Sequence, residues 1–176
     1  MSYSRRVIGL LLGSFIGLTA CGFTPVYGPQ GPGAQLRVQV SMDAPANRNE
    51  FDLVAQLELR LGHSDTPVYR LSYQIDTEQK GVGVTPEQEI VRFNVFGKVR
   101  YTLHDAVTGA ALVTGSADTF TGYSAGAVDV TASPPTGTNA TIATVAAQRN
   151  ANARLMVALA DQVVTQLIAT SPDWQR

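Results

Sequence analysis

The chain is poor in cysteine, histidine and charge. One cysteine among 176 residues excludes an internal disulfide and a multi-cysteine metal site, and two histidines are too few for the usual zinc clusters without carboxylate help. Charged residues make up 15% of the chain, against roughly 25% in an average globular domain. With 13 basic and 14 acidic side chains the formal net charge is −1, which argues against a strongly basic nucleic-acid binder and against an acidic disordered tail.

The apolar run at the start of the chain is too short for a stable membrane-spanning helix. Val7–Leu18 follows the basic pair Arg5 and Arg6, and a bilayer-crossing helix needs roughly 20 apolar residues. Its length and its flanks are typical of the central region of a signal peptide. We therefore expect residues 1–20 to be removed, which changes the formal net charge from −1 to −3 because both arginines go with them.

The residues that follow this run predict a lipid anchor. The string Leu18-Thr19-Ala20-Cys21 resembles a bacterial lipobox and contains the only cysteine of the chain. The resemblance implies cleavage before Cys21, a diacylglyceryl thioether on its sulfur and an acyl chain on its new amine. Two or three acyl chains anchor a protein stably to a membrane without spanning it. Gly22, in place of the Asp common in lipoproteins retained in the inner membrane, favours the outer membrane. The alternative is a buried free thiol behind a signal peptide that is cut elsewhere.

The mature chain divides into a tether, one domain and a tail. Residues 21–35 hold four glycines and three prolines, which predicts a lipidated flexible tether with turns. Residues 36–170 are expected to form a single α+β domain, and residues 171–176 a polar tail.

Periodicity within that domain predicts the order β-α-β-β-β-α. Apolar and polar residues alternate in the expected strands, whereas leucines recur every fourth residue in the first helix, which Asn49 caps and Gly62 ends. The expected segments are strand 36–41, helix 50–61, strands 69–76, 90–105 and 111–123, a hairpin turn at 105–109, a flexible loop at 124–140 and a helix at 141–169. We expect a two-layer sandwich in which two helices cover one face of a four-stranded, mainly antiparallel sheet.

The two faces of the long third strand differ in character. Apolar side chains on one face predict the core: Val91, Phe93, Val95, Val99, Tyr101 and Leu103. In the last helix a stripe that includes Val157, Val164 and Leu167 is expected to pack against this core.

The mature region is expected to start with the string Cys21-Gly22-Phe23-Thr24-Pro25-Val26-Tyr27-Gly28. This start resembles the opening of the lipopolysaccharide-assembly lipoprotein E (LptE) family. The resemblance extends more loosely over the element order and the terminal helix, including Leu159-Ala160-Asp161-Gln162-Val163-Val164. It implies a sandwich of two helices and four strands. It also implies a plug inside the barrel protein that inserts lipopolysaccharide into the outer leaflet, which helps that barrel fold and binds lipopolysaccharide. The alternative function is a generic outer-membrane lipoprotein that binds another envelope lipid or a cell-wall partner.

No arrangement in the sequence predicts catalysis, a resident cofactor or a metal site. His63 follows a helix end and His104 ends a strand, and neither shows the base-and-nucleophile pattern of covalent catalysis. Gly81-Val82-Gly83 lacks the third glycine and the strand-to-helix setting of a dinucleotide loop. We therefore expect no enzymatic activity and no partner nucleic acid.

The polar face of the long strand is the candidate lipopolysaccharide contact. Arg92, Lys98 and Arg100 share this face with Phe96, and Arg70 lies on the same side of the neighbouring strand. Guanidinium groups bind phosphates through paired hydrogen bonds, and an exposed ring suits an acyl chain or a barrel wall. Two other interpretations remain open: a solvated polar face with one stray aromatic side chain, and a cationic face opposite acidic residues of a barrel lumen.

Overall fold

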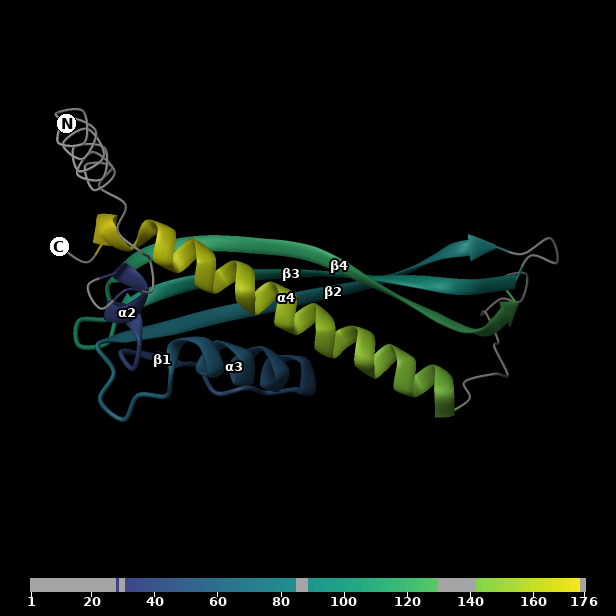
Figure 1. Cartoon of the computed structure of the whole chain (residues 1–176), viewed down its shortest axis with the longest axis horizontal. Coiled ribbons are helices and arrows are strands. Elements are labelled where there is room, and N and C mark those ends of the chain that lie inside the picture. The colour runs from purple at the N-terminus through teal and green to yellow at the C-terminus, as the bar shows by residue number, and fades with distance from the viewer. Residues whose placement is uncertain (1–27, 29–30, 85–88, 130–141, 175–176) are drawn as a thin grey trace, which may run out of the picture.

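The computed structural model describes residues 28, 31–84, 89–129 and 142–174. Its elements are α2 (Pro32–Leu36), β1 (Val40–Met42), α3 (Arg48–Leu61), β2 (Tyr69–Val84), β3 (Glu89–Asp105), β4 (Ala111–Asp129) and α4 (Ile142–Trp174). The strands form a four-stranded sheet of order β1-β2-β3-β4, in which β1 is parallel to β2 and the other pairs are antiparallel. The helices pack on one face, so the predicted α+β sandwich is confirmed (Figure 1).

The strands of the meander are longer than the sequence pattern predicts. β2 continues through Gly81 and Gly83, where the pairing with β3 shifts register, whereas the sequence predicts a loop there. β4 likewise continues to Asp129 into the predicted loop, and the rest of that loop, 130–141, lies outside the described residues. Glycine lacks a side chain to pack and weakens a strand, but pairing along the neighbouring strand holds these segments extended.

Helix α3 begins two residues earlier than the sequence analysis places it. Asn47, not Asn49, is the N-cap: its Oδ1 accepts a hydrogen bond from the backbone N–H of Glu50 at 3.0 Å. The Glu50 carboxylate in turn accepts from the N–H of Ala46 at 2.6 Å and from Asn47 Nδ2 at 2.7 Å, so both side chains hold the start of the helix. Gly62 ends the helix as predicted, with a φ of 82° that suits glycine.

Both ends of the predicted domain differ from expectation. Pro32–Leu36 forms helix α2 inside the predicted tether, and its last residue is fully buried, so the first strand begins only at Val40. At the other end α4 runs through the predicted polar tail to Trp174, whose indole packs edge-on against Tyr69 with ring centroids 5.1 Å apart. Apolar burial therefore adds both segments to the folded unit.

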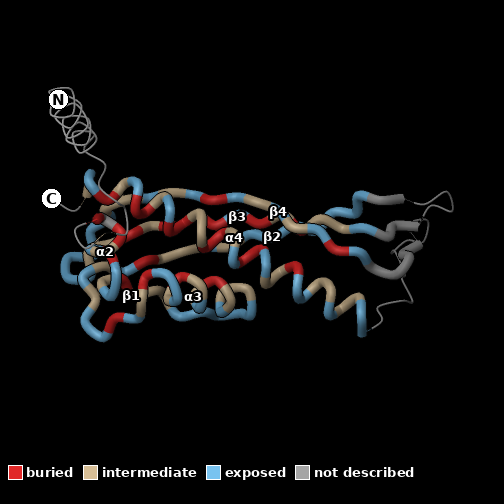
Figure 2. The backbone as a smooth tube through the Cα atoms, viewed as in Figure 1, coloured by how far each residue is buried: buried red, intermediate tan, exposed pale blue. Residues whose placement is uncertain are grey.

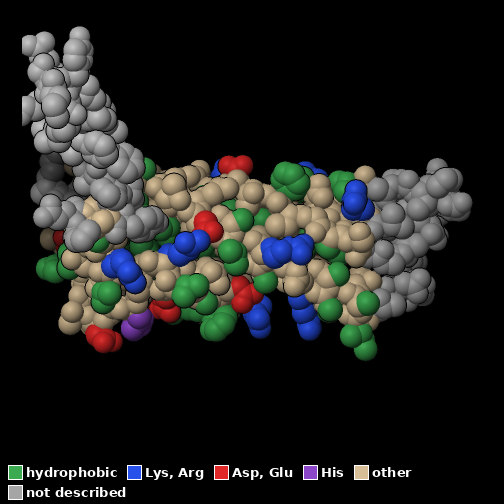
Figure 3. Space-filling model, viewed as in Figure 1, with side chains coloured by type: hydrophobic (Ala, Val, Ile, Leu, Met, Phe, Trp, Pro, Cys, Tyr) green, Lys and Arg blue, Asp and Glu red, His purple; other side chains and the backbone are tan. Residues whose placement is uncertain are grey.

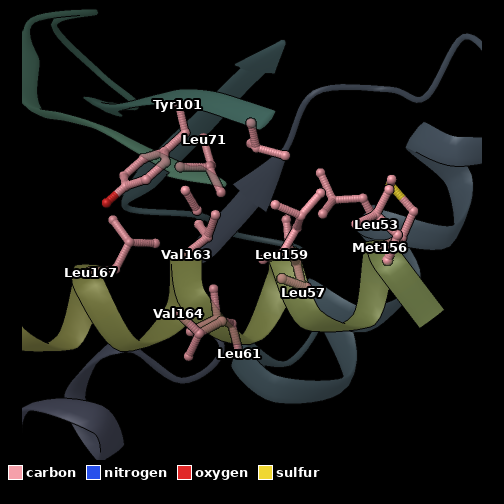
Figure 4. Close-up of a cluster of buried hydrophobic side chains, with 14 of the residues drawn as sticks. Leu53, Leu57, Leu61, Leu71, Tyr101, Met156, Leu159, Val163, Val164 and Leu167 are labelled. Carbon is pink, nitrogen blue, oxygen red and sulfur yellow. The ribbon is translucent and has the colours of Figure 1, made fainter. Parts of the chain in front are cut away.

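The core lies between the sheet and α4, with α3 packed chiefly against α4 (Figures 2 and 4). Val95, Val99, Tyr101 and Leu103 of β3 are buried as predicted, and Phe93 is partly buried against them, while the side chain of Val91 lies outside the described residues. The predicted stripe on α4 is wrong in part, because the Val157 side chain is 37% exposed. The predicted Leu167 is fully buried, and the other fully buried apolar residues of α4 are Ala151, Leu155, Met156, Leu159 and Ala160.

We predict that the two asparagines at the start of α3 differ in their effect on stability. Asn47→Ala should lower the free energy of unfolding by about 1 kcal/mol, the usual loss when a capping side chain is removed. Asn49→Ala, the matched control inside the helix, should change it by a few tenths of a kcal/mol. Urea unfolding followed by circular dichroism measures both. Equal losses for the two variants would contradict the assignment of the cap to Asn47.

Candidate functional site

The sheet has a second face, opposite α4, that we call the outer face. It carries the even-numbered side chains of β2 from Arg70 to Lys80 and of β3 from Arg92 to His104, with the even-numbered side chains of β4 alongside. No helix within the described ranges covers this face. The five predicted contact residues on the sheet, Arg70, Arg92, Phe96, Lys98 and Arg100, all lie on it.

Carboxylates neutralise part of the positive charge on the outer face. Arg100 Nη2 lies 2.7 Å from Asp76 Oδ2, and Arg70 Nη1 lies 3.2 Å from Asp43 Oδ1. Lys98 is in register between Asp76 on β2 and Asp118 on β4. All of these pairs are half exposed, so water screens them and they add little to stability.

The cations form a line along the sheet rather than one cluster. Arg92 and Arg100 are eight residues apart on β3, which is roughly 27 Å at about 3.4 Å per residue. Arg70 lies further on, opposite His104. Only Lys98 and Arg100, in neighbouring rows beside Asp76, are brought close together.

An aromatic pair stands in the middle of this line. Phe96 and Phe120 are directly opposite each other on β3 and β4, with ring centroids 5.5 Å apart, and the Phe120 side chain is 58% exposed. Lys80 Nζ lies 5.3 Å from the centre of the Phe96 ring. The pair lines a shallow hollow of about 390 Å³ together with Lys98 and three carboxylates, those of Asp76, Glu78 and Asp118. Glu78 Oε2 also lies 3.1 Å from Lys80 Nζ. Sequence analysis missed Phe120, although alternation in 119–121 could have placed it outward.

This arrangement suits a ligand or partner that is both apolar and anionic. Exposed rings offer an apolar surface to an acyl chain or to a protein wall, and exposed apolar patches on a polar face commonly mark interaction sites. Lys80 and Lys98 beside the rings, and Arg100 one row beyond Lys98, can contact phosphate or carboxylate groups by exchanging the exposed carboxylates with which Lys80 and Arg100 now pair. On the helix-bearing side, too, basic and acidic side chains are interspersed over a broad surface (Figure 3).

His104 lies on the outer face in contact with a serine and a turn carbonyl. His104 Nε2 lies 3.0 Å from Ser72 Oγ, and that hydroxyl also lies 3.2 Å from the carbonyl of Thr102, to which it can donate. His104 Nδ1 lies 3.4 Å from the carbonyl of Gly109 in the β3–β4 turn, so the contacts of this ring join neighbouring parts of the sheet. His63 contacts the exposed carboxylate of Glu58 at 3.1 Å.

The groups whose pKa values are shifted lie on the helix side of the sheet and in the turn at its end. Burial, with a contribution from the nearby Glu50 and Asp43 charges, raises the pKa of Tyr73 to about 12. Hydrogen bonds from Thr108 and Val107 in the β3–β4 turn hold the pKa of Asp105 below its usual value. These shifts accompany a buried ring and a tight turn, which are structural features.

The described residues contain no cluster of metal-ligating side chains and no helix long and apolar enough to cross a membrane. Cys21, the predicted lipid attachment site, lies outside the described residues, as do most of the predicted tether and the string that starts at Cys21.

Comparison with known proteins shows the fold to be that of several bacterial lipoproteins. A candidate lipoprotein of Caulobacter crescentus superposes with a TM-score of 0.63 at 22% identity, covering 82% of this chain and 98% of its own. Rare lipoprotein B of Shewanella oneidensis gives a TM-score of 0.55 at 10% identity, over 80% and 99% of the two chains. A minor lipoprotein of Acinetobacter baumannii gives 0.54 at 15% identity, over 76% and 94%. No protein-family model and no curated protein sequence matches the chain.

We predict that the two sides of β3 contribute differently to stability. Lys98→Ser on the outer face should change the free energy of unfolding by no more than about 0.5 kcal/mol, as is usual for exposed sites. Leu103→Ala, on the buried side, should lower it by about 2–5 kcal/mol. Thermal unfolding of both variants measures the difference, and a Lys98→Ser loss as large as that of Leu103→Ala would show that the outer face is packed rather than free.

Proposed function

We propose that the protein is a lipid-anchored lipoprotein on the periplasmic side of the outer membrane, where it seats in and assists the assembly of the barrel protein that inserts lipopolysaccharide. In this proposal it binds lipopolysaccharide through the outer face of its sheet. The protein acts by binding and positioning rather than by catalysis, and it needs no cofactor beyond the acyl chains covalently attached to Cys21.

The observation that carries the proposal is the string Cys21–Gly28, which begins at the expected lipidation site and resembles the opening of the lipopolysaccharide-assembly lipoprotein E family. The fold supports it, because proteins named as lipoproteins in three bacteria have the same architecture. The fold alone does not define a partner, so the outer face has to supply the chemistry.

The outer face supports this role through the combination of its side chains. Lipid A carries phosphates next to acyl chains, and the Phe96–Phe120 pair lies beside Lys80 and Lys98, with Arg100 in the next row of β3. The two rings offer an apolar surface and the cations offer charged hydrogen bonds within one short stretch of sheet. A barrel wall lined with acidic side chains would fit the same surface, so the experiment must separate the two.

We predict that Cys21 is the acylated N-terminus of the mature protein. Mass spectrometry of the N-terminal peptide from membranes should show diacylglycerol and a further acyl chain on Cys21, and no peptide from residues 1–20. The Cys21→Ala variant should carry no acyl chains and remain folded, because residue 21 precedes the described fold. An unmodified Cys21, or cleavage at another position, would overturn the proposed anchor.

We predict that the outer-face cations are needed for lipopolysaccharide binding. The tagged full-length protein, purified from membranes, should bring down an outer-membrane barrel protein, and it should bind purified lipopolysaccharide. The triple variant Arg92→Ser/Lys98→Ser/Arg100→Ser should lose most lipopolysaccharide binding and keep the barrel. The control Arg37→Ser/Arg60→Ser removes exposed cations away from the outer face and should keep both.

Each outcome of this experiment has a distinct meaning. Undiminished lipopolysaccharide binding by the triple variant rejects the outer face as the contact. Loss of the barrel with lipopolysaccharide binding intact assigns these residues to the protein interface instead. If depletion of the protein leaves the amount of folded barrel and surface lipopolysaccharide normal, the assembly role is rejected.

A further inference from the structure

Strand β2 has an edge that is mostly unpaired. β1 is three residues long and pairs with β2 only from Tyr69 to Leu71, and Asp43 then accepts a hydrogen bond from the Tyr73 hydroxyl at 3.0 Å. β2 itself continues to Val84. Beyond Leu71 no strand of the described chain pairs with this edge.

The backbone groups on this edge follow from the ladder pattern. β1 bonds to odd-numbered residues of β2, as in the 3.1 Å bond from the N–H of Asp43 to the carbonyl of Leu71. Because successive residues of a strand point their N–H and C=O groups to opposite sides, Tyr73, Ile75, Thr77 and Gln79 also point theirs outward. The stretch ends where Gln148 of α4 donates to the Gln79 side chain at 3.0 Å. The edge from Tyr73 to Gln79 therefore offers unpaired backbone N–H and C=O groups with which another strand can pair.

The opposite edge of the sheet is protected, which makes the free edge of β2 distinctive. Side chains of α4 reach the outward carbonyls of β4: Arg154 donates to the carbonyl of Gly122 at 2.9 Å, and Gln166 donates to that of Ser116 at 3.1 Å. Proteins commonly cover sheet edges in this way to prevent unwanted pairing. In the described chain, α4 does not protect β2 in the same way between Tyr73 and Gln79.

On the helix side one hollow adjoins the free edge and a second continues from it between α3 and α4. One, of about 310 Å³, lies between Ile75 and Thr77 of β2 and the start of α3. The other, of about 720 Å³, lies between the start of α3 and Arg149 of α4, and the two share Arg48 and Asn49 as lining residues. A strand added to β2 would direct every second side chain into this space.

The charged side chains around the two hollows favour an added strand that carries an acidic side chain. Arg48 is paired with Asp52 at 3.0 Å, whereas Arg149 on the opposite wall has no ion pair with any residue of the described ranges. A second copy of this chain, pairing through its own β2, would bring the neutral side chains of Tyr73, Ile75, Thr77 and Gln79 to this side. An acidic side chain on an incoming strand complements Arg149, and a neutral one does not.

We propose that the free edge of β2, from Tyr73 to Gln79, binds an extended strand of the partner protein by strand addition, with an acidic side chain of that strand facing Arg149. Main-chain hydrogen bonds to the odd-numbered residues supply the affinity, and the hollow beside Arg149 supplies the selectivity. The inference deepens the function proposed above and rests on it, because the partner is the barrel protein recovered with the full-length protein.

Two proline variants test the strand pairing. Thr77→Pro removes an outward N–H from the free edge, and Thr114→Pro removes an outward N–H from β4, where the inference places no partner. Thr77→Pro should lower the amount of recovered barrel by about tenfold. A loss of this size is expected because the proline removes one or two main-chain hydrogen bonds and its ring fits poorly against an added strand. Thr114→Pro should leave recovery unchanged. Arg149→Glu should reduce recovery, and Arg149→Lys should retain it.

Residue-resolved amide exchange of the unaltered protein gives a second readout that does not depend on how the variants fold. In the free protein the amides of Ser72, Gln74 and Asp76 should exchange slowly, because they bond to β3, and those of Ile75 and Thr77 should exchange rapidly. In the barrel complex Ile75 and Thr77 should become slow as well. Slowing in the free protein that increases with its concentration would assign the edge to self-association and overturn the inference.

The outcomes separate this inference from the proposed function. Recovery of a barrel with equal yield for Thr77→Pro, or rapid exchange at Ile75 and Thr77 within the complex, overturns strand addition and leaves the function standing. Failure of the unaltered protein to recover any barrel overturns the proposed function, and the inference with it.

Discussion

Gly97 lies in the middle of β3, directly beneath Leu155 and Leu159 of α4. A Cβ atom on this residue would be 2.8 Å from Leu155 Cδ2 and 3.0 Å from Leu159 Cδ1, so only glycine allows the helix to approach this closely without displacing buried leucines. At this distance α4 both fills the inner face of the sheet and protects the β4 edge through Arg154 and Gln166. One helix therefore does most of the covering, and the outer face and the β2 edge stay free for binding.

Much of the fold follows from local patterns, and the errors arise where long-range packing decides. Alternation along β3 is regular enough to predict its buried side, since the described apolar residues of that side, Phe93, Val95, Val99, Tyr101 and Leu103, all belong to the core or pack against it. The face of α4 is harder to predict, because small alanines occur around the whole helix, and its position is set by the close approach at Gly97. The extension of β2 past Gly81 depends on pairing with β3, which local propensity does not include.

Sequence alternation predicts which side chains of β3 share the outer face, but not which side chains of the neighbouring strands lie beside them. Alternation places Phe96, Lys98 and Arg100 on one side of β3. Their partners depend on the register, which shifts by one residue between Leu103 and His104 just before the turn. Without that irregularity Phe96 would lie opposite Thr119, whose side chain would then replace that of Phe120, and the aromatic pair would not form. A sequence pattern contains no signal strong enough to place such a shift.

The central claim is that the outer face of the sheet binds the barrel protein or lipopolysaccharide. Photo-crosslinking in intact cells tests it most directly, with a photoreactive amino acid at Phe120 on the outer face or at Leu59, an exposed apolar residue in the last turn of α3, whose first turn borders the hollows beside β2 (58% and 72% exposed). The account predicts crosslinks from position 120 to the barrel protein or to lipopolysaccharide, and none to either from position 59. Crosslinks to the barrel or to lipopolysaccharide from position 59, with none from position 120, would contradict the account.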